Sequence, residues 1–519
     1  MVNKKIDCKT TLLYIGYIII MFFLFTRKIN YHIDELLSYN LANAEAGFSV
    51  NEAETYSPAG KPFVDAMSSK GKFELNHVWK QQTNDTHPPL YYVLLHGICT
   101  LFPNTVSMRY AAVINIIFEL FILYIIRKIL RLLLSDERMV FITSMAYILC
   151  AGVLSITTFL RMYVISIFWV VLATYLFIKY INEYRIRDFV LISLVTIGGA
   201  LTHYYNLIYL FFISVVVGVL MLYEKRIREM LFLILSMMGA GGCALLIFPG
   251  MVRHILDSNG RGMESIENLS KKDLFEQLEI YVDLLNVNIF GNVLLPIVGI
   301  IFFTFVLYLF RDEMDEGNTW LTALEKKRYI CMLLPTILYI IVVSKSAPYN
   351  TDRYISPIYG VVFVGVLSLL IRCLEYYFVN KKPLLFIYGF TISIMISIGL
   401  NNCNWPYLNT HTREMLEYAE MQGGSTDAIC IYDLCWKILP SYLEISKCRS
   451  VTFYEAEDYT AYKDKVKYIE TGEQIALFLI GIDQDEFLNA FMEDNPEYKI
   501  IKESGGSGYG ACIYLKKGQ

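Results

Sequence analysis

The sequence predicts a polytopic α-helical membrane protein that ends in a small soluble α/β domain. Of its 519 residues, 55% are hydrophobic and only 18% are charged, whereas a soluble protein carries about 25% charged residues. Apolar runs that reach or approach the ~20 residues of a membrane-spanning helix recur up to about Leu400. Beyond that point candidate strands alternate with helical segments, which is typical of an α/β domain. The net charge of -4 gives no indication of nucleic acid binding.

The first apolar run, at about 10–25, is predicted to be an uncleaved signal anchor, because no small-residue cleavage site follows it. By the positive-inside rule, the basic residues before it place this end in the cytoplasm: Lys4, Lys5 and Lys9. Arg27 and Lys28, at the far end of the same span, run against that rule.

Clusters of Lys and Arg mark five later loops as cytoplasmic, near 127–138, 179–187, 225–228, 311–328 and 372–382. Their alternation with the apolar runs predicts about eleven crossings, with 12–13 as the alternative. The predicted spans are 10–27, 107–131, 138–158, 163–182, 188–202, 205–223, 229–249, 288–310, 329–345, 355–377 and 383–400. The connections near 159–163, 202–206, 252–286 and 345–356, and the C-terminus, are then extracytoplasmic.

A polar, acidic segment at 29–86 is predicted to be a large extracytoplasmic loop. The apolar stretch at 87–103 is short and begins with His87-Pro88-Pro89, so it is interpreted as a half-buried or re-entrant helix whose first turn tolerates proline. The expected domains are a transmembrane domain at 1–400 and an extracytoplasmic α/β domain at 401–519.

The tail is expected to contain helices at 413–421 and 436–445 and strands at 428–432, 450–454 and 475–480. The 11 cysteines include no CxxC pair, which argues against a zinc ribbon. Five of them lie in the tail, where a disulfide is an open alternative if the tail faces an oxidising compartment.

Asp34 and Glu35 stand directly after the first span, at or just beyond a membrane surface. A carboxylate beside hydrocarbon is costly unless it is solvated or paired, so two together form a functional-site hypothesis. The alternative is that they are only the hydrated end of a helix hairpin.

The topology gathers polar residues from distant parts of the chain on the extracytoplasmic side, as a transfer reaction on an anionic, lipid-borne substrate would need. Arg161 and Arg353 lie at apolar span ends, where a guanidinium can bind a phosphate or merely snorkel to the interface. His203 ends a span and has a structural helix-capping role as its alternative. Asp85 and His87 are the only candidates for a metal site, but they lack the spacing of metal ligands, so none is predicted.

These residues, in this order, resemble the GT-C superfamily of membrane glycosyltransferases. The most similar branch holds the protein O-mannosyltransferases and the aminoarabinose transferases that modify lipid A. The motifs that carry the resemblance cover about the first 400 residues: Asp34-Glu35, His87-Pro88-Pro89-Leu90-Tyr91-Tyr92, Ser107-Met108-Arg109-Tyr110, Arg161-Met162-Tyr163, His203-Tyr204-Tyr205 and Arg353-Tyr354.

The resemblance implies transfer of a hexose or pentose from a polyprenyl-phosphate-linked donor to a protein, lipid or glycan acceptor. The reaction would occur on the extracytoplasmic face of a bacterial-type plasma membrane. Asp34 would be the catalytic base, with Glu35 as its partner. The donor phosphate would be bound by Arg161, Tyr163, Arg353 and Tyr354. The remaining substrate contacts would come from Asp85, His87, Tyr91, His203 and Tyr204. No cofactor is required, although some members of the superfamily bind divalent ions near the site.

The chemistry agrees with these residue types. A hydroxyl acceptor that attacks an anomeric carbon needs a base within hydrogen-bond reach. The leaving phosphate needs positive charge around it, which Arg161 or Arg353 could supply. One carboxylate with cationic phosphate ligands gives a single displacement with inversion, without the paired carboxylates of glycoside hydrolases.

Three alternatives remain. A sensory or scaffold protein whose working part is the tail is one of them, and the other two are membrane functions. A polymerase or ligase of lipid-linked glycans would use similar arginines and a similar outer loop. A lipid or glycan flippase or transporter is a different class, and against it the sequence shows no internal repeat and no paired broken helices in corresponding positions of two halves.

Overall fold

The computed structural model describes residues 8–257, 260–310, 320–378, 381–422, 424–465, 473–505 and 508–518. They divide into two compact units. The membrane unit comprises the residues up to Phe23, Gln82–Tyr91 and Ala112–Trp405. The sheet unit comprises Leu24–Gln81, Tyr92–Ala111 and the residues from Pro406 on. Lys4, Lys5 and positions 311–319 of the predicted cytoplasmic loop near 311–328 lie outside the described residues.

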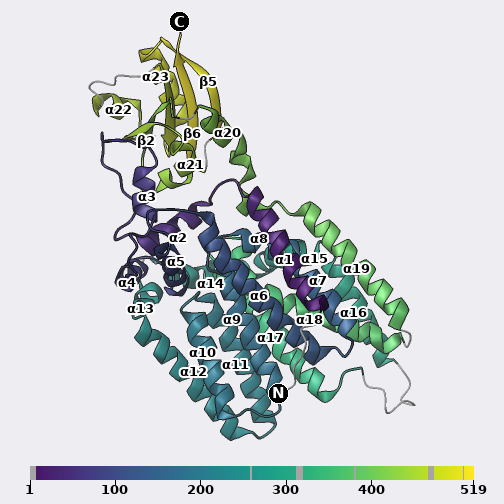
Figure 1. The fold of residues 1–519 in the computed structure, drawn as a ribbon. Coiled ribbons are helices and arrows are strands. Elements are labelled where there is room, and N and C mark those ends of the chain that lie inside the picture. Colours follow the sequence, from purple (N-terminus) through teal and green to yellow (C-terminus); the bar gives the residue numbers. More distant parts are fainter. Residues whose placement is uncertain are drawn as a thin grey trace. The chain divides into compact units, whose positions relative to one another are not determined.

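The membrane unit is built from long helices (Figure 1). In chain order its helices are α1 (Cys8–Arg27), α6 (Met108–Leu133), α7 (Glu137–Ile148), α8 (Ala151–Thr158), α9 (Tyr163–Lys179), α10 (Ile186–Ala200), α11 (Tyr205–Tyr223), α12 (Ile227–Ile247), α13 (Gly250–Leu256), α14 (Arg261–Lys271), α15 (Leu274–Phe290), α16 (Leu294–Leu309), α17 (Ala323–Ser346), α18 (Tyr359–Tyr377) and α19 (Lys381–Asn402). The first few residues of α6 and the last few of α1 belong to the sheet unit. Large side chains such as Tyr147, Tyr209 and Tyr339 are fully buried between them. Phe302 and Phe303 on α16 are more than half exposed, which suits a helix whose solvent is lipid.

Every predicted span coincides with a helix or with part of a bent helix pair. Among the described residues, however, only six helices are long and apolar enough to cross a membrane, or up to eight if each bent pair is one span. The prediction of about eleven crossings is therefore higher than these criteria support. Length explains part of the difference, because α9 and α10 have only 17 and 15 residues.

The spans predicted at 138–158 and 288–310 are broken. The chain bends by 47° between α7 and α8, and by 93° between α15 and α16. The second bend lies at Gly291, which ends α15 in the left-handed conformation with φ of 54°. A Cβ atom there would lie 2.1 Å from the carbonyl oxygen of Met395, so this turn requires glycine. The connection predicted at 252–286 is also largely helical, since α13, α14 and most of α15 lie within it.

The sheet unit is organised around a six-stranded mixed sheet with the order β1-β3-β2-β4-β6-β5 (Figure 1). Its strands are β1 (Thr55–Tyr56), β2 (Asp427–Tyr432), β3 (Ser450–Glu455), β4 (Gln474–Ile480), β5 (Tyr498–Gly505) and β6 (Gly510–Lys517). β2 pairs in parallel with β3 and β4, and the remaining pairs are antiparallel. β2 and β4 are buried along almost their whole length, as their continuous apolar sequences predict. The predicted small α/β domain is confirmed.

The helices of the tail are α20 (Arg413–Gln422), α21 (Tyr442–Ile445), α22 (Tyr459–Lys465) and α23 (Gln484–Asp494). The helix predicted at 436–445 is a 3₁₀ segment at Cys435–Ser441 that continues into α21. The five tail cysteines are all free, so no disulfide joins them in this structure: Cys403, Cys430, Cys435, Cys448 and Cys512.

The predicted loop at 29–86 has secondary structure of its own. It contains α2 (Ile33–Asn43), β1, α3 (Lys61–Met67) and α4 (Leu75–Asn84), and it is followed by the short apolar helix α5 (Leu90–Thr100). β1 is an edge strand of the sheet, antiparallel to β3, with Thr55 opposite Thr452 and Tyr56 opposite Val451. Most of this loop therefore belongs to the same compact unit as the C-terminal residues.

Candidate active site

A connected group of polar side chains lies where helices of the membrane unit begin and end. In the turn before α5, Nδ1 of His87 lies 2.8 Å from Oδ2 of Asp85. A terminal guanidinium nitrogen of Arg161 lies 3.2 Å from Nε2 of the same imidazole. Arginine can only donate, so Nε2 of His87 accepts this bond and Nδ1 carries the proton that is donated to Asp85. The three side chains form one hydrogen-bonded row.

Arg161 lies in the break between α8 and α9, and its side chain is almost completely buried. Two groups hold this break. Nδ2 of Asn115 on α6 donates to the carbonyl oxygens of Thr157 and Phe159, at 3.0 and 2.7 Å. The hydroxyl of Tyr91 donates to the carbonyl oxygen of Leu160 at 2.7 Å. These bonds to the carbonyl groups of Thr157, Phe159 and Leu160 fix the backbone that leads to Arg161.

The charge of Asp85 follows from its neighbours. Burial raises the pKa of this carboxyl, but the contact with His87, the backbone N–H of Thr86 and the nearby Arg161 outweigh it and lower the pKa to about 2. Asp85 is therefore ionised at neutral pH and neutralises one positive charge of the group.

His203, between α10 and α11, lies within the same group. Its ring centroid is 6.5 Å from that of His87 and 5.6 Å from that of Tyr163. The backbone N–H of Tyr205 donates to Nδ1 of His203 at 3.2 Å. Burial, followed by the nearby His87 and the two arginines, lowers the pKa of His203 to about 3. The imidazole is thus neutral at pH 7, with its proton on Nε2.

Arg353 and Tyr354 reach this group through aromatic rings. Tyr354 packs edge-on against Tyr205 with centroids 5.3 Å apart, and its carbonyl oxygen accepts a bond of 2.7 Å from the hydroxyl of Tyr339. The guanidinium of Arg353 lies over the rings of Tyr349 and Tyr354, at 5.6 and 5.2 Å from their centroids. Such contacts orient a guanidinium.

Tyr204 contacts His254, a residue that the sequence analysis did not single out. Its hydroxyl is hydrogen-bonded to Nδ1 of His254 on α13 at 2.6 Å. The other ring nitrogen of His254 is buried and has no hydrogen-bond partner among the described residues. No sequence motif marks His254, which lies in the extracytoplasmic connection predicted at 252–286.

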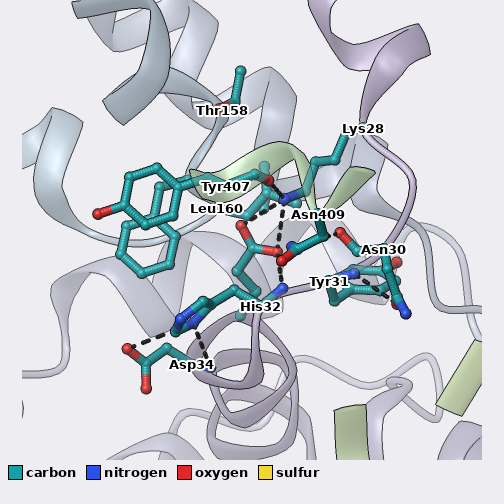
Figure 2. A network of polar contacts seen from close by, with 12 residues as sticks. Lys28, Asn30, Tyr31, His32, Asp34, Thr158, Leu160, Tyr407 and Asn409 are labelled. Carbon is teal, nitrogen blue, oxygen red and sulfur yellow. Dashed lines mark hydrogen bonds and ion pairs between the residues drawn. The ribbon is translucent and has the colours of Figure 1, made fainter. Parts of the chain in front are cut away.

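The adjacent carboxylates belong to the sheet unit, at the start of α2, and the structure gives them different environments. Glu35 is fully buried, and its two oxygens lie 3.0 Å from Nζ of Lys28, which is also fully buried. The carboxylate of Glu35 also accepts from the backbone N–H of His32 at 2.9 Å, which caps α2. Asp34 keeps 23% of its side chain exposed and lies 3.8 Å from the ring of His32 (Figure 2).

Comparison with solved structures gives the fold. ArnT from Cupriavidus metallidurans, crystallised with undecaprenyl phosphate, is similar to this chain with a TM-score of 0.53 and 8% sequence identity, over 98% of each chain. The chain has the GT-C fold. An oligosaccharyltransferase from Archaeoglobus fulgidus gives a TM-score of 0.46 and 11% identity over 92% of this chain and 70% of its own. No family model and no curated protein sequence matches the chain.

Most of the residues proposed from the sequence meet in the membrane unit of this GT-C fold. The contacts above join five of them into one group: Asp85, His87, Arg161, Tyr163 and His203. Tyr91 bonds the backbone of the break that carries Arg161. Tyr354 contacts Tyr205. Tyr204 directly follows His203 in the chain. Asp34 and Glu35 lie in the other unit.

The sequence analysis missed Lys28, Asn115 and His254. Lys28 had a signal, because a basic residue at the outer end of the first span runs against the positive-inside rule. Within the described ranges, no three His, Cys, Asp or Glu side chains are placed to hold a metal ion. Asp85 and His87, the weak metal candidates, are hydrogen-bonded to each other.

Proposed function

We propose that this protein is a membrane glycosyltransferase that transfers a sugar from a polyprenyl-phosphate-linked donor to an acceptor on the extracytoplasmic face. The observation that carries the proposal is the likeness of fold, over 98% of both chains, to a protein crystallised with undecaprenyl phosphate. The apolar outer surface of the bundle is consistent with a donor that stays in the membrane.

The proposed donor site is the polar group of the membrane unit. Arg161 and Arg353 would bind the phosphate, with Tyr163 and Tyr354 beside them. Asp85 and His87 would orient the guanidinium of Arg161 through the hydrogen bonds already described. A neutral His203 adds a donor on Nε2 without another positive charge. A pre-oriented guanidinium stabilises the negative charge that develops on the leaving phosphate, because it needs no reorganisation during the reaction.

The proposed base is Asp34. It would accept the proton of the acceptor hydroxyl as the oxygen attacks the anomeric carbon, while the bond from that carbon to the phosphate oxygen breaks. The products are the glycosylated acceptor, in inverted configuration, and free polyprenyl phosphate. Glu35 is the less suitable base, because its carboxylate already bonds Lys28 and the backbone of His32.

This scheme requires no cofactor, since the leaving group is stabilised by arginine and the proton is accepted by a carboxylate. The sugar would be a hexose or a pentose, and the acceptor a protein, a lipid or a glycan. The site and the C-terminal domain would be extracytoplasmic, in agreement with the charge distribution of the loops.

The test is to incubate the purified protein in lipid nanodiscs with a panel of polyprenyl-phosphate sugars and candidate acceptors. Free polyprenyl phosphate and the glycosylated acceptor should appear in equal amounts with at least one donor, and the Asp34→Asn variant should form neither at a comparable rate. Movement of intact donor between leaflets without cleavage would instead support a transporter. Transfer of a whole oligosaccharide would support a ligase.

A further inference from the structure

The segment that leads to Asp34 is bonded, residue by residue, to a segment of the C-terminal part of the chain (Figure 2). Nζ of Lys28 donates to the carbonyl oxygen of Tyr407. The backbone N–H of Ile29 donates to the carbonyl oxygen of Leu408 at 2.9 Å. Nδ2 of Asn409 donates to the carbonyl oxygen of Asn30 at 3.1 Å. Residues 28–30 are therefore fixed by residues 407–409.

Lys28 is fully satisfied in this arrangement. An ammonium group has three N–H donors, and three acceptors surround Nζ: the two oxygens of Glu35 and the carbonyl oxygen of Tyr407. Burial lowers the pKa of Lys28, and the opposing effect of Glu35 favours the charged form. Both side chains are fully buried, so removing one would leave the other as an uncompensated charge away from water.

Glu35 links this segment to the first turn of α2 by hydrogen bonds. Its carboxylate accepts from the backbone N–H of His32, while Nδ1 of His32 accepts from the backbone N–H of Asp34 at 3.2 Å. The two bonds form a capping box, which sets the direction in which a helix starts. The position of Asp34 therefore depends on Glu35, and through Glu35 on Lys28 and Tyr407.

We propose that residues 407–409 anchor the loop that carries the catalytic base, and that Lys28 and Glu35 are the positioning residues of this anchor. The proposal rests on the function proposed above. It gives the C-terminal part of the chain a role in catalysis that needs no substrate contact: the part holds Asp34 where the acceptor hydroxyl must meet it. A misplacement of about 1 Å can cost about 10²-fold in rate, so a loosened anchor should lower turnover strongly.

The anchor can be tested without activity, by hydrogen–deuterium exchange of the backbone amides of residues 34–36 in the full-length protein. Lys28→Met removes the ammonium at similar length and should raise their exchange rates about tenfold or more. Lys28→Met combined with Glu35→Gln removes both charges and keeps an acceptor for His32, so it should restore most of the protection. The control is Lys70→Met, which removes a lysine from an exposed ion pair with Asp65 in the same unit and should change nothing.

The consequence for catalysis is tested in the polyprenyl phosphate release assay. Lys28→Met should lower kcat by about 10²-fold, with KM for the donor within about twofold of wild type, and the double variant should recover part of kcat. A generally unfolded protein would lose donor binding as well. If Lys28→Met does not accumulate, Glu35→Gln and Lys28→Arg take its place. The first should reproduce the loss of kcat and the second should retain activity.

Exchange rates that do not differ between Lys28→Met and wild type would overturn the anchor. Faster exchange with unchanged kcat would overturn the positioning role. A wild-type protein that cleaves none of the donors would overturn the proposed function and the positioning role together, while the exchange rates would still decide the anchor.

Discussion

Arg161 donates a hydrogen bond from its guanidinium to Nε2 of His87, 3.2 Å away, across 74 residues of sequence. The opposite nitrogen of the same imidazole bonds the ionised Asp85. A short turn before α5 thus determines how a buried arginine in a break between two helices is oriented.

This arrangement predicts the effect of removing the arginines. Arg161→Ala and Arg353→Ala should each weaken binding of polyprenyl phosphate about ten- to hundredfold, because each removes charged hydrogen bonds worth about 1.5–3 kcal/mol. Native mass spectrometry or a fluorescence titration in detergent would measure the affinity. Arg228→Ala is a suitable control, since that exposed guanidinium lies over the ring of Phe232. Unchanged affinity in both variants would make Arg161 and Arg353 simple membrane anchors.

Asp34→Asn should lower turnover by about 10²–10⁴-fold, the usual contribution of a general base, with donor affinity near that of wild type. Glu35→Gln should cost less in turnover but more in stability, because it leaves the buried ammonium of Lys28 without its counter-charge. Single-turnover kinetics and thermal unfolding separate the two effects. If both variants kept wild-type turnover, neither carboxylate would be the base, and Asp85 would be the next candidate.

The topology prediction concerns the C-terminal end. A reporter that is active only in the cytoplasm should stay silent when it is fused after Gln519, because the alternation of basic loops places the tail outside. The same reporter fused within the predicted cytoplasmic loop near Lys225 should be active. Strong activity of the C-terminal fusion would contradict both the topology and an extracytoplasmic site.

Glu444 should make the stability of the sheet unit depend on pH. Burial raises the pKa of this carboxyl from 4.5 to about 7. Oε1 accepts from Nδ2 of Asn30 at 3.2 Å, and Oε2 has no partner among the described residues. A raised carboxyl pKa means that the folded state holds a proton that the unfolded state releases. The contribution of Glu444 to the free energy of unfolding is therefore fully present below pH 4.5. It falls by about 3 kcal/mol as the pH rises towards 7, and it does not change further above that pH.

Glu444→Gln keeps the bond to Asn30 and removes the titration. The variant should match wild type near pH 4.5 and melt at a higher temperature than wild type at pH 8. The neighbouring Cys512 and Tyr514 have pKa values raised by burial and stay uncharged over this range. A difference in melting temperature that is the same at both pH values would show that Glu444 is not the titrating group.

The sequence predicted the position of the spans well, because a bilayer leaves helices as almost the only solution for a long apolar run. It did not predict the bends at 47° and 93°, since hydropathy averages over a residue such as Gly291 whose backbone conformation makes the turn. Strand β1 was also missed. β1 has two residues and no periodicity of its own, and it exists only because β3 offers an edge.

The candidate site was predictable in part for a similar reason. Asp34, His87 and Arg161 are polar residues at the ends of apolar runs, which a reader of the sequence can find. Lys28 and Asn115 act by bonding backbone or side-chain groups that are distant along the chain, and only the folded structure brings their partners to them. The violation of the positive-inside rule by Lys28 was the one local sign that it has a buried partner.

The pairing of β1 with β3 also has a consequence for the order of assembly during synthesis. Thr55 and Thr452, whose hydroxyls are hydrogen-bonded, are 397 residues apart. At about 5–20 residues per second, a ribosome needs roughly 20–80 s to make the intervening chain. The loop with the proposed base therefore emerges early and waits for its partner strand until synthesis is nearly complete. We expect a nascent or truncated chain that already occupies the membrane to lack the completed sheet unit, and therefore to lack the proposed activity towards lipid-linked sugars.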